Sequence, residues 1–177
     1  MRELIEDFTK HITESISISK STTLSPFSGN IENVLICGLG GSGIGGTIIA
    51  QVVSQDANCP ITINKDYKIP AFIGSNTLVI CCSYSGNTEE TLEMLAQAET
   101  KGATIACITS GGKLEKIAKE KKYNHIVIPG GNPPRAAFGL AFPTLFFMLN
   151  HFNVISNNHI DQFNNAISTI KSEENNI

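Results

Sequence analysis

The sequence predicts an α/β fold, a three-layer α/β/α doubly wound sandwich with a five-stranded parallel sheet. Short apolar runs alternate along the chain with longer segments of helical periodicity, which is the order of successive βαβ units. The runs are apolar at consecutive positions, as expected for strands that are buried on both faces between layers of helices. With 177 residues, the chain is long enough for one domain with a core of its own.

Five apolar runs are expected to form the strands, and four longer segments are expected to form helices. The strands are residues 34–37, 61–63, 77–82, 104–108 and 125–128, and the helices are residues 43–54, 88–101, 113–121 and 136–152. In the second helix, Leu92, Leu95 and Ala96 have the spacing of one buried face. Pro143 interrupts the last helical segment, which is shorter than the about 20 residues of a membrane span and therefore predicts a buried helix.

Flanking segments extend this domain at both ends. We expect residues 33–152 to form the domain itself, and residues 1–32 to hold an N-terminal helix, at about 2–19, and a lead-in to the first strand. Residues 153–177, rich in Asn and Ser, are expected to form a helical tail or a linker to a second half. The apolar positions of weak helical spacing in this tail are Ile160, Phe163, Ile167 and Ile170.

The composition excludes several kinds of protein and partner. Apolar residues make up 41% and charged residues 16%, which is typical of a folded globular domain rather than a disordered chain. The net charge is −3 and Lys and Arg do not cluster, so neither a nucleic acid nor a membrane is an expected partner. Acids and bases are mixed over residues 1–10, which argues against a signal peptide.

The cysteines indicate a reducing compartment. They are Cys37, Cys59, Cys81, Cys82 and Cys107, of which all but Cys59 lie inside apolar runs. No two of them have the C-x-x-C spacing of redox or metal sites, so we interpret them as small core residues of a cytoplasmic protein and expect no metal.

The first unusual turn, residues 38–46, follows the first strand. Ligands of such sheets bind beyond the carboxyl ends of the strands. Six of these nine residues are glycine, more than a tight strand-to-helix turn requires. Glycine lets the backbone approach a ligand, and the start of the next helix offers free N–H groups to an anion. The turn therefore predicts an anion site, to which Ser42 adds a hydroxyl.

A dinucleotide site is a weaker interpretation of the same turn. Gly38, Gly40 and Gly43 satisfy the pattern G-x-G-x-x-G. In dinucleotide-binding domains an acid ends the second strand, whereas here Asn64 and Lys65 follow that strand.

A second unusual turn follows the third strand. Ser83, Ser85 and Thr88 place three hydroxyls at the start of a helix, where hydroxyl and backbone N–H groups can both donate to a phosphate. A capping box formed by Asn87 and Glu90 is the structural alternative. Because capping accounts for only one or two of these side chains, the turn predicts a phosphate site.

Two further segments follow the fourth and fifth strands. Residues 109–113 reach the same edge of the sheet, and the sequence leaves open whether their role is binding or purely structural. Residues 129–137 place Arg135 at the expected start of a helix, where a cation opposes the helix dipole. We therefore expect a sugar phosphate or a reaction oxyanion beside Arg135, with an ion pair to a surface carboxylate as the alternative.

Together these segments resemble a known family. Residues 83–88, Ser-Tyr-Ser-Gly-Asn-Thr, match the Ser-x-Ser-Gly-x-Thr signature of the sugar isomerase (SIS) domain, which binds phosphosugars. Further segments similar to the N-terminal half of the bifunctional phosphoglucose/phosphomannose isomerases, in the family's order, are residues 38–46, 67–70, 108–114 and 134–139. The resemblance covers about residues 33–152 and implies a flavodoxin-like SIS fold.

The resemblance implies an aldose–ketose isomerase that interconverts glucose 6-phosphate or mannose 6-phosphate with fructose 6-phosphate. It implies that the substrate phosphate is bound by Gly41, Ser42, Ser83, Ser85 and Thr88. It further implies that Arg135 is a catalytic residue that stabilises a cis-enediolate intermediate, and that no metal or other cofactor takes part.

The resemblance is incomplete, because members of that family carry two SIS domains. The Glu that transfers the proton and the His that opens the sugar ring lie in the second half. The histidines of this sequence, none of which lies in that motif, are His11, His125, His151 and His159. Glu89 and Glu90 fit first-turn helix acids better than a catalytic base.

Three interpretations follow for a chain of 177 residues. It is a fragment of a full isomerase, it needs a second polypeptide that carries the other half, or it is a non-catalytic phosphosugar-binding SIS module. In each case we expect a homodimer or pairing with a second SIS half, with the apolar helix 136–152 and the tail from residue 156 as the expected contact surface.

Overall fold

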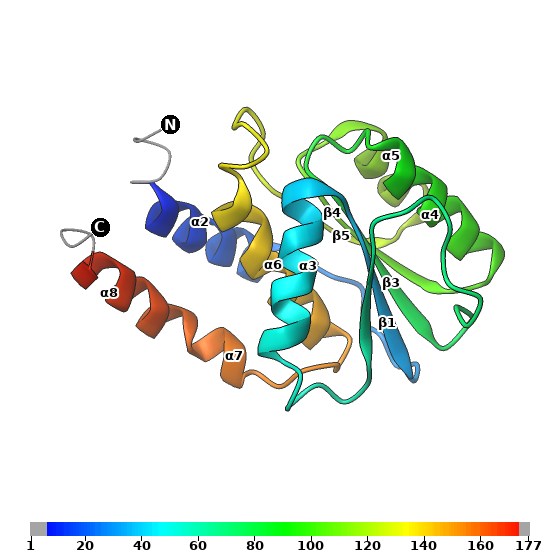
Figure 1. Cartoon of the computed structure of the whole chain (residues 1–177), viewed down its shortest axis with the longest axis horizontal. Coiled ribbons are helices and arrows are strands. Elements are labelled where there is room, and N and C mark those ends of the chain that lie inside the picture. The colour runs from blue at the N-terminus through cyan, green and yellow to red at the C-terminus, as the bar shows by residue number, and fades with distance from the viewer. Residues whose placement is uncertain (1–6, 174–177) are drawn as a thin grey trace.

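The computed structural model describes residues 7–173 and has three layers, with helices on both faces of one sheet (Figure 1). The strands are β1 (Asn33–Cys37), β2 (Ile61–Asn64), β3 (Thr77–Ser83), β4 (Thr104–Thr109) and β5 (Asn124–Val127). The helices are α2 (Phe8–Ser21), α3 (Gly40–Val52), α4 (Glu89–Thr100), α5 (Gly112–Lys121), α6 (Phe138–His151), α7 (Asn158–Asp161) and α8 (Phe163–Glu173). The predicted α/β sandwich with a five-stranded parallel sheet is confirmed.

The sheet has the order β2-β1-β3-β4-β5, and every neighbouring pair is parallel. Strand β1, next to the edge strand β2, pairs on both sides, with Leu35 opposite Thr62 of β2 and Val79 of β3. From β1 the chain crosses to one edge of the sheet, and from β3 it crosses to the other. The order of strands therefore reverses between β1 and β3, and this is the switch point where doubly wound sheets bind ligands.

Alternate residues of each strand enter two separate cores. Val34 and Ile36 of β1 face the core beneath α2, α3, α6 and α8, while Leu35 and Cys37 face the core beneath α4 and α5. All four side chains are fully buried. This explains why the strands are apolar at consecutive positions, since each one is covered by helices on both faces.

Two helices begin two or three residues away from the start that the sequence predicts. α3 begins at Gly40 rather than at residue 43, because Leu39 is extended and its carbonyl already accepts from Ser42 N and Gly43 N. α6 begins at Phe138 rather than at residue 136, because Ala136 N donates to Pro133 O at 2.8 Å and closes a separate turn. The first change brings Ser42 into a helix, and the second leaves Arg135 outside one.

The flanking helices lie on the α6 side of the sheet (Figure 1). Of the N-terminal helix expected at 2–19, residues 2–6 lie outside the described residues, and α2 continues to Ser21. Ser15 Oγ donates to Leu140 O at 2.7 Å and joins α2 to α6. In the tail, Phe163 packs edge-on against Phe146 with ring centroids 5.0 Å apart. No helix within residues 7–173 has both the length and the apolar character to cross a membrane.

Candidate functional site

The glycine turn, residues 38–46, is shaped by the absence of side chains. A Cβ on Gly43 would lie 2.5 Å from Gly38 O, and one on Gly46 would lie 2.9 Å from Ile36 Cγ2. Both distances are shorter than real contacts, so neither position accepts a larger residue without a shift of the backbone or core. The tight turn leads directly into the first turn of α3, whose leading N–H groups have no partner within the helix.

Ser42 lies in this first turn of α3, half-buried. Its hydroxyl makes no hydrogen bond to the part of the chain that the structure describes, residues 7–173. Gly41 lies beside the segment that carries Arg135, since a Cβ on Gly41 would be 3.3 Å from Pro134 O. The helix N-terminus, the free hydroxyl and the adjacent cationic segment together have the donors and the positive charge that an anion site requires.

The serine turn, residues 83–91, is instead held together by its own hydroxyls. Ser83 Oγ and Thr88 Oγ1 are hydrogen-bonded at 2.7 Å, and Gly86 N donates to Ser83 Oγ at 3.1 Å. Ser85 Oγ accepts from Asn87 N at 3.2 Å and is exposed. Hydroxyls fixed in this way beside a helix start can turn toward a phosphate without a change in the backbone.

The capping box of Asn87 and Glu90, the structural alternative to a phosphate site, does not form. Thr88, not Asn87, is the N-cap residue of α4, and no side chain caps the helix. Asn87 Oδ1 accepts from Lys113 N at 3.1 Å, and its amide donates to Ser85 O at 3.1 Å. Asn87 therefore joins the serine turn to the start of α5, and the hydroxyls of Ser83 and Thr88 stay free of capping.

Residues 109–113 form a wall of the serine turn rather than a separate binding loop. Thr109 Oγ1 donates to Gly111 O at 2.8 Å, and Leu114 N donates to Gly86 O at 2.9 Å. A Cβ on Gly86 would lie 1.7 Å from Gly111 O, so the two turns are in direct backbone contact. These contacts favour the structural interpretation of residues 109–113.

Arg135 lies at the same edge, in the Pro133–Ala136 turn and three residues before α6 begins at Phe138. The expectation that it stands in the first helical turn is therefore wrong, and the argument from the helix dipole loses its basis. Arg135 is exposed and forms no ion pair with a carboxylate of residues 7–173. The surface ion pair weighed as an alternative is thus absent from the described part of the chain.

Two further residues lie at this edge that the sequence did not indicate as candidate site residues. Lys65 follows β2, and its Cε would be 3.1 Å from a Cβ on Gly43, so its stem lies over the glycine turn. Tyr84, between Ser83 and Ser85, bonds through its hydroxyl to the loop that carries Arg135. A cation directly after a strand was the available signal for Lys65, whereas no local pattern signals Tyr84.

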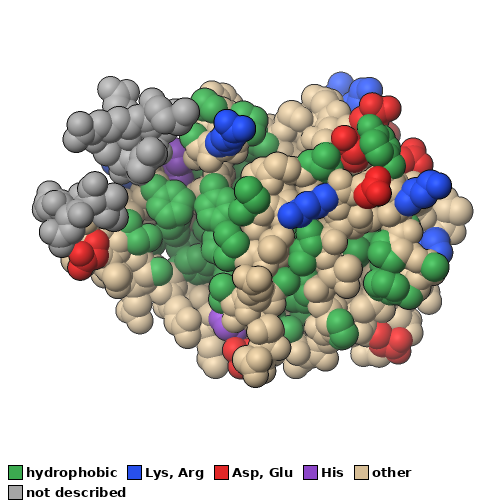
Figure 2. Space-filling model, viewed as in Figure 1, with side chains coloured by type: hydrophobic (Ala, Val, Ile, Leu, Met, Phe, Trp, Pro, Cys, Tyr) green, Lys and Arg blue, Asp and Glu red, His purple; other side chains and the backbone are tan. Residues whose placement is uncertain are grey.

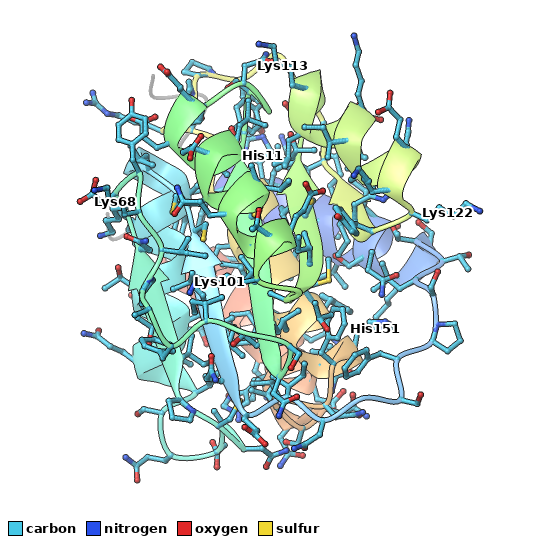
Figure 3. All side chains as sticks on the ribbon, turned by 90° about the vertical axis from the view of Figure 1, so that its right-hand side faces the viewer. His11, Lys68, Lys101, Lys113, Lys122 and His151 are labelled. Carbon is cyan, nitrogen blue, oxygen red and sulfur yellow. The ribbon has the colours of Figure 1, made fainter. Side chains whose placement is uncertain are left out.

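An open groove lies beside the serine turn on the side of α4. Its lining residues are Tyr67, Asn87, Glu89, Leu92, Glu93 and Lys113. Partial burial raises the pKa of Tyr67, and the Glu89 and Glu90 carboxylates raise it further. In Figure 3, Lys113 is labelled at the top of the molecule and Lys68 at the left.

Three cysteines lie opposite one another on the neighbouring strands β1, β3 and β4. Cys81 of β3 is opposite Cys37 of β1 on one side and Cys107 of β4 on the other. All three are free and buried, and burial raises the pKa of Cys107 to about 12. The three side chains therefore serve as core packing residues, and no three His, Cys, Asp or Glu side chains of residues 7–173 are grouped as metal ligands would be.

The histidines make contacts with the scaffold. His125 Nδ1 lies 2.8 Å from Tyr123 O, and His151 Nε2 lies 2.9 Å from Ser25 O. His159 Nε2 lies 3.1 Å from Asp56 Oδ2. His11 lies against the first turn of α6, where a Cβ on Gly139 would be 3.0 Å from the His11 Cβ. His151 lies near Asn124 at the amino end of β5, and Figure 3 shows it well below Lys113.

Comparison with known proteins decides the family. Residues 30–154 match the family model described as the SIS domain. The chain belongs to this family. A bifunctional phosphoglucose/phosphomannose isomerase from Caldicellulosiruptor bescii is 40% identical over 155 residues, which is 88% of this chain and 46% of that relative. The chain therefore spans less than half the length of the isomerase it matches.

Other relatives of the SIS chain include one enzyme of the same description and one of a different description. A bifunctional phosphoglucose/phosphomannose isomerase from Thermoplasma acidophilum is 45% identical over 112 residues, 63% of this chain and 34% of the relative. A D-glucosamine-6-phosphate 4-epimerase from Sulfolobus acidocaldarius is 38% identical over 120 residues, 67% of this chain and 38% of the relative. Among solved structures, the C-terminal domain of a glucosamine-fructose-6-phosphate aminotransferase from Francisella tularensis has a TM-score of 0.69 at 16% identity, covering 97% of this chain and 54% of that one. That likeness concerns the fold alone.

Proposed function

We propose that this chain is the phosphosugar-binding first half of an isomerase that interconverts glucose 6-phosphate or mannose 6-phosphate with fructose 6-phosphate. The observation that carries the proposal is the meeting of the glycine turn, the serine turn and the Arg135 segment at the switch point of the sheet. The 40% identity to a bifunctional isomerase supports this choice of reaction.

In this proposal the two turns share the substrate phosphate. The first turn of α3, with Gly41 and Ser42, supplies backbone N–H groups and a hydroxyl, and Ser83, Ser85 and Thr88 supply hydroxyls from the other side. The net charge of −3 does not attract an anion over a distance, so recognition depends on these local donors. The phosphate anchors the sugar, whose reacting carbons extend from the cradle.

Arg135 then acts on the reacting carbons. Proton transfer between C1 and C2 passes through an enediolate, whose negative charge a guanidinium stabilises more in the transition state than in the ground state. Because Arg135 has no carboxylate partner within residues 7–173, its charge is available to the substrate. The proton-transferring Glu and ring-opening His are proposed to come from a second SIS half, and no cofactor is proposed.

The proposed organisation has residues 33–152 as the binding domain of a cytoplasmic protein, flanked by 1–32 and 153–177. The second half, or a second copy in a homodimer, is proposed to pack on the α6 side. There the rings of Phe138 and Phe142 are stacked 5.0 Å apart and only partly buried. Figure 2 shows hydrophobic side chains gathered on this side of the molecule, whereas Lys and Arg side chains are scattered.

Calorimetric titration of the 177-residue chain with fructose 6-phosphate, together with a coupled assay for glucose 6-phosphate, tests the proposal. We expect binding without turnover by the chain alone, and turnover when the second half is supplied. In the complete enzyme, Arg135→Ala is expected to lower kcat by about 100-fold or more with a small change in KM.

The matched control is Lys116→Ala on exposed α5, which removes the same charge away from the site. Unchanged turnover in Arg135→Ala would remove this residue from the mechanism. Absence of fructose 6-phosphate binding would refute the phosphosugar site itself.

A non-catalytic phosphosugar-binding module is the second candidate. It is favoured by the lack of a base with a matching motif near the two turns, where the carboxylates of Glu89 and Glu90 lie in the first turn of α4. The same two assays separate the candidates, since a module binds fructose 6-phosphate and shows no turnover even with the second half present.

A further inference from the structure

The hydroxyl of Tyr84 closes the loop that precedes Arg135. It donates to Pro129 O at 3.0 Å and accepts from Asn132 N at 3.0 Å. Pro129 and Asn132 are the first and last residues of a four-residue turn, in which Gly131 has a φ of 92°. A direct bond between these two backbone groups usually closes such a turn. Here the tyrosine hydroxyl lies between the two backbone groups, donates to the carbonyl of Pro129 and accepts from the N–H of Asn132.

The turn is joined to Arg135 by a stiff segment. Pro133 and Pro134 fix their own φ angles, and Ala136 N donates to Pro133 O at 2.8 Å to close a second turn around Arg135. Pro134 O in turn rests against Gly41 in the first turn of α3. With so little backbone freedom between Asn132 and Arg135, the position of the first constrains the position of the second.

Tyr84 itself is held firmly from below. Its carbonyl accepts from Ser110 N at 3.0 Å and from Ser110 Oγ at 2.5 Å, which ties it to the loop after β4. Its ring packs against the core between the sheet and α6 and lines a small apolar cavity with Ser42 and Phe142. The residue therefore connects the rigid base of the serine turn to the loop that carries the cation.

We propose that Tyr84 is a positioning residue that acts through Arg135, by holding the 129–132 turn so that the guanidinium faces the cradle. This inference rests on the proposed function, because it assigns Arg135 a bound anion. Ser83 and Ser85, its neighbours, bind the phosphate, while Tyr84 sets the place of the charge that acts on the reacting carbons. One stretch of three residues thus aligns both ends of the substrate.

Hydrogen exchange of the full chain tests, without any ligand, whether the two hydrogen bonds of the Tyr84 hydroxyl hold the loop. Tyr84→Phe keeps the ring and removes only the hydroxyl, which frees Asn132 N and Pro129 O. We expect amide exchange in residues 130–137 to become at least about tenfold faster, with residues 83–88 unchanged. Tyr123→Phe is the matched control, since Tyr123 OH bonds to Glu99 beside α5. Equal exchange in Tyr84→Phe and the parent chain would overturn the proposal.

Ligand binding tests whether Tyr84 acts through Arg135. The probes are inorganic phosphate and 5-phospho-D-arabinonate, whose carboxylate carries negative charge where an enediolate would. We expect Tyr84→Phe to weaken binding of the arabinonate about tenfold and of phosphate less than about twofold. In the Arg135→Ala background, Tyr84→Phe should add no further loss, because the two changes remove one interaction.

The outcomes separate the two proposals. If the parent chain binds neither probe, the proposed function fails, and the Tyr84 proposal fails with it even if exchange becomes faster. If the parent chain binds both probes but Tyr84→Phe weakens both equally, or weakens the arabinonate equally with and without Arg135, only the positioning role is refuted. Thermal unfolding of each variant identifies any general loss of structure.

Discussion

The glycine turn and the serine turn occupy equivalent places after β1 and β3, yet they are built in opposite ways. The glycine turn owes its shape to missing side chains, as Gly43 packs against Gly38 O where a Cβ would be only 2.5 Å away. The serine turn owes its shape to added side chains, as Ser83 Oγ bonds to Thr88 Oγ1 at 2.7 Å and to Gly86 N at 3.1 Å.

This difference separates two effects of substitution. A change at a glycine alters the backbone path and therefore costs folding stability as well as binding. A change at a hydroxyl leaves the backbone path nearly intact and mainly costs binding. Gly86 is the exception within the serine turn, because it is the point where that turn meets Gly111 of the next loop.

The largest loss of unfolding free energy is expected for a substitution of Gly86. Gly86→Ala would bring a Cβ to 1.7 Å from Gly111 O at a backbone φ of 67°. Gly102, with a φ of 70° and open space around its Cβ position, is the matched control. Gly86→Ala is expected to cost about 4 kcal/mol or more of the free energy of unfolding, and Gly102→Ala about 1 kcal/mol. Urea unfolding measures both, and equal losses would show that the contact between turns is unimportant.

A smaller loss is expected in the glycine turn. Gly43→Ala forces a Cβ toward Gly38 O, so it should cost about 2–3 kcal/mol of unfolding free energy and most of the affinity for fructose 6-phosphate. In Gly45→Ala, two residues along α3, the Cβ would meet Leu145 at 3.5 Å, Phe142 at 3.8 Å and Phe138 at 3.9 Å, which are ordinary contact distances, so this change should be neutral or stabilising by up to about 1 kcal/mol. Comparable unfolding and binding in the two variants would contradict a turn shaped by missing side chains.

The smallest change in folding is expected at the hydroxyls. Thr88→Val removes one of the two hydrogen-bond partners of Ser83 Oγ but no helix cap, since the Thr88 side chain does not cap α4. We expect fructose 6-phosphate binding to weaken about tenfold, with a loss of unfolding free energy of about 1 kcal/mol or less. Thr100→Val, at the other end of α4, is the control in calorimetry. An unaltered affinity in Thr88→Val would remove this hydroxyl from the phosphate site.

The elements of the fold were predictable where one physical signal dominates. Strands buried on both faces, such as β3 with Leu78 to Cys82, are apolar at every position, and no surface requirement obscures the pattern. The start of α3 was not predictable in the same way. Glycine is a poor helix former and indicated a loop, whereas Gly40, at a φ of 53°, makes the turn that lets Ser42 N and Gly43 N donate to Leu39 O and start α3.

The site was predictable as a set of turns but not as a set of contacts. The common carboxyl edge of the parallel strands carries the turns that hold Ser42, Ser83 and Arg135, as the sequence predicts, whereas a shared binding role of the three residues stays a prediction. The contacts of Tyr84 could not be predicted from the sequence, because its hydroxyl bonds to residues 45 and 48 positions away in the chain. Such pairing is decided by how β5 and its following loop fold back, which no local pattern encodes.

The pairing of α2 with α6 also has a consequence for synthesis of the protein. Ser15 reaches Leu140 across 125 residues, and Phe8 lies against Phe138. At about 5–20 residues per second, a ribosome needs roughly 6–25 s to make the chain between them. During that interval the apolar face of α2, with Ile12 and Ile16, has no α6 to cover it. Helix α2 is thus synthesised before every strand but is among the last elements to pack. Until α6 is made, the apolar face of α2 is a segment that chaperones can bind.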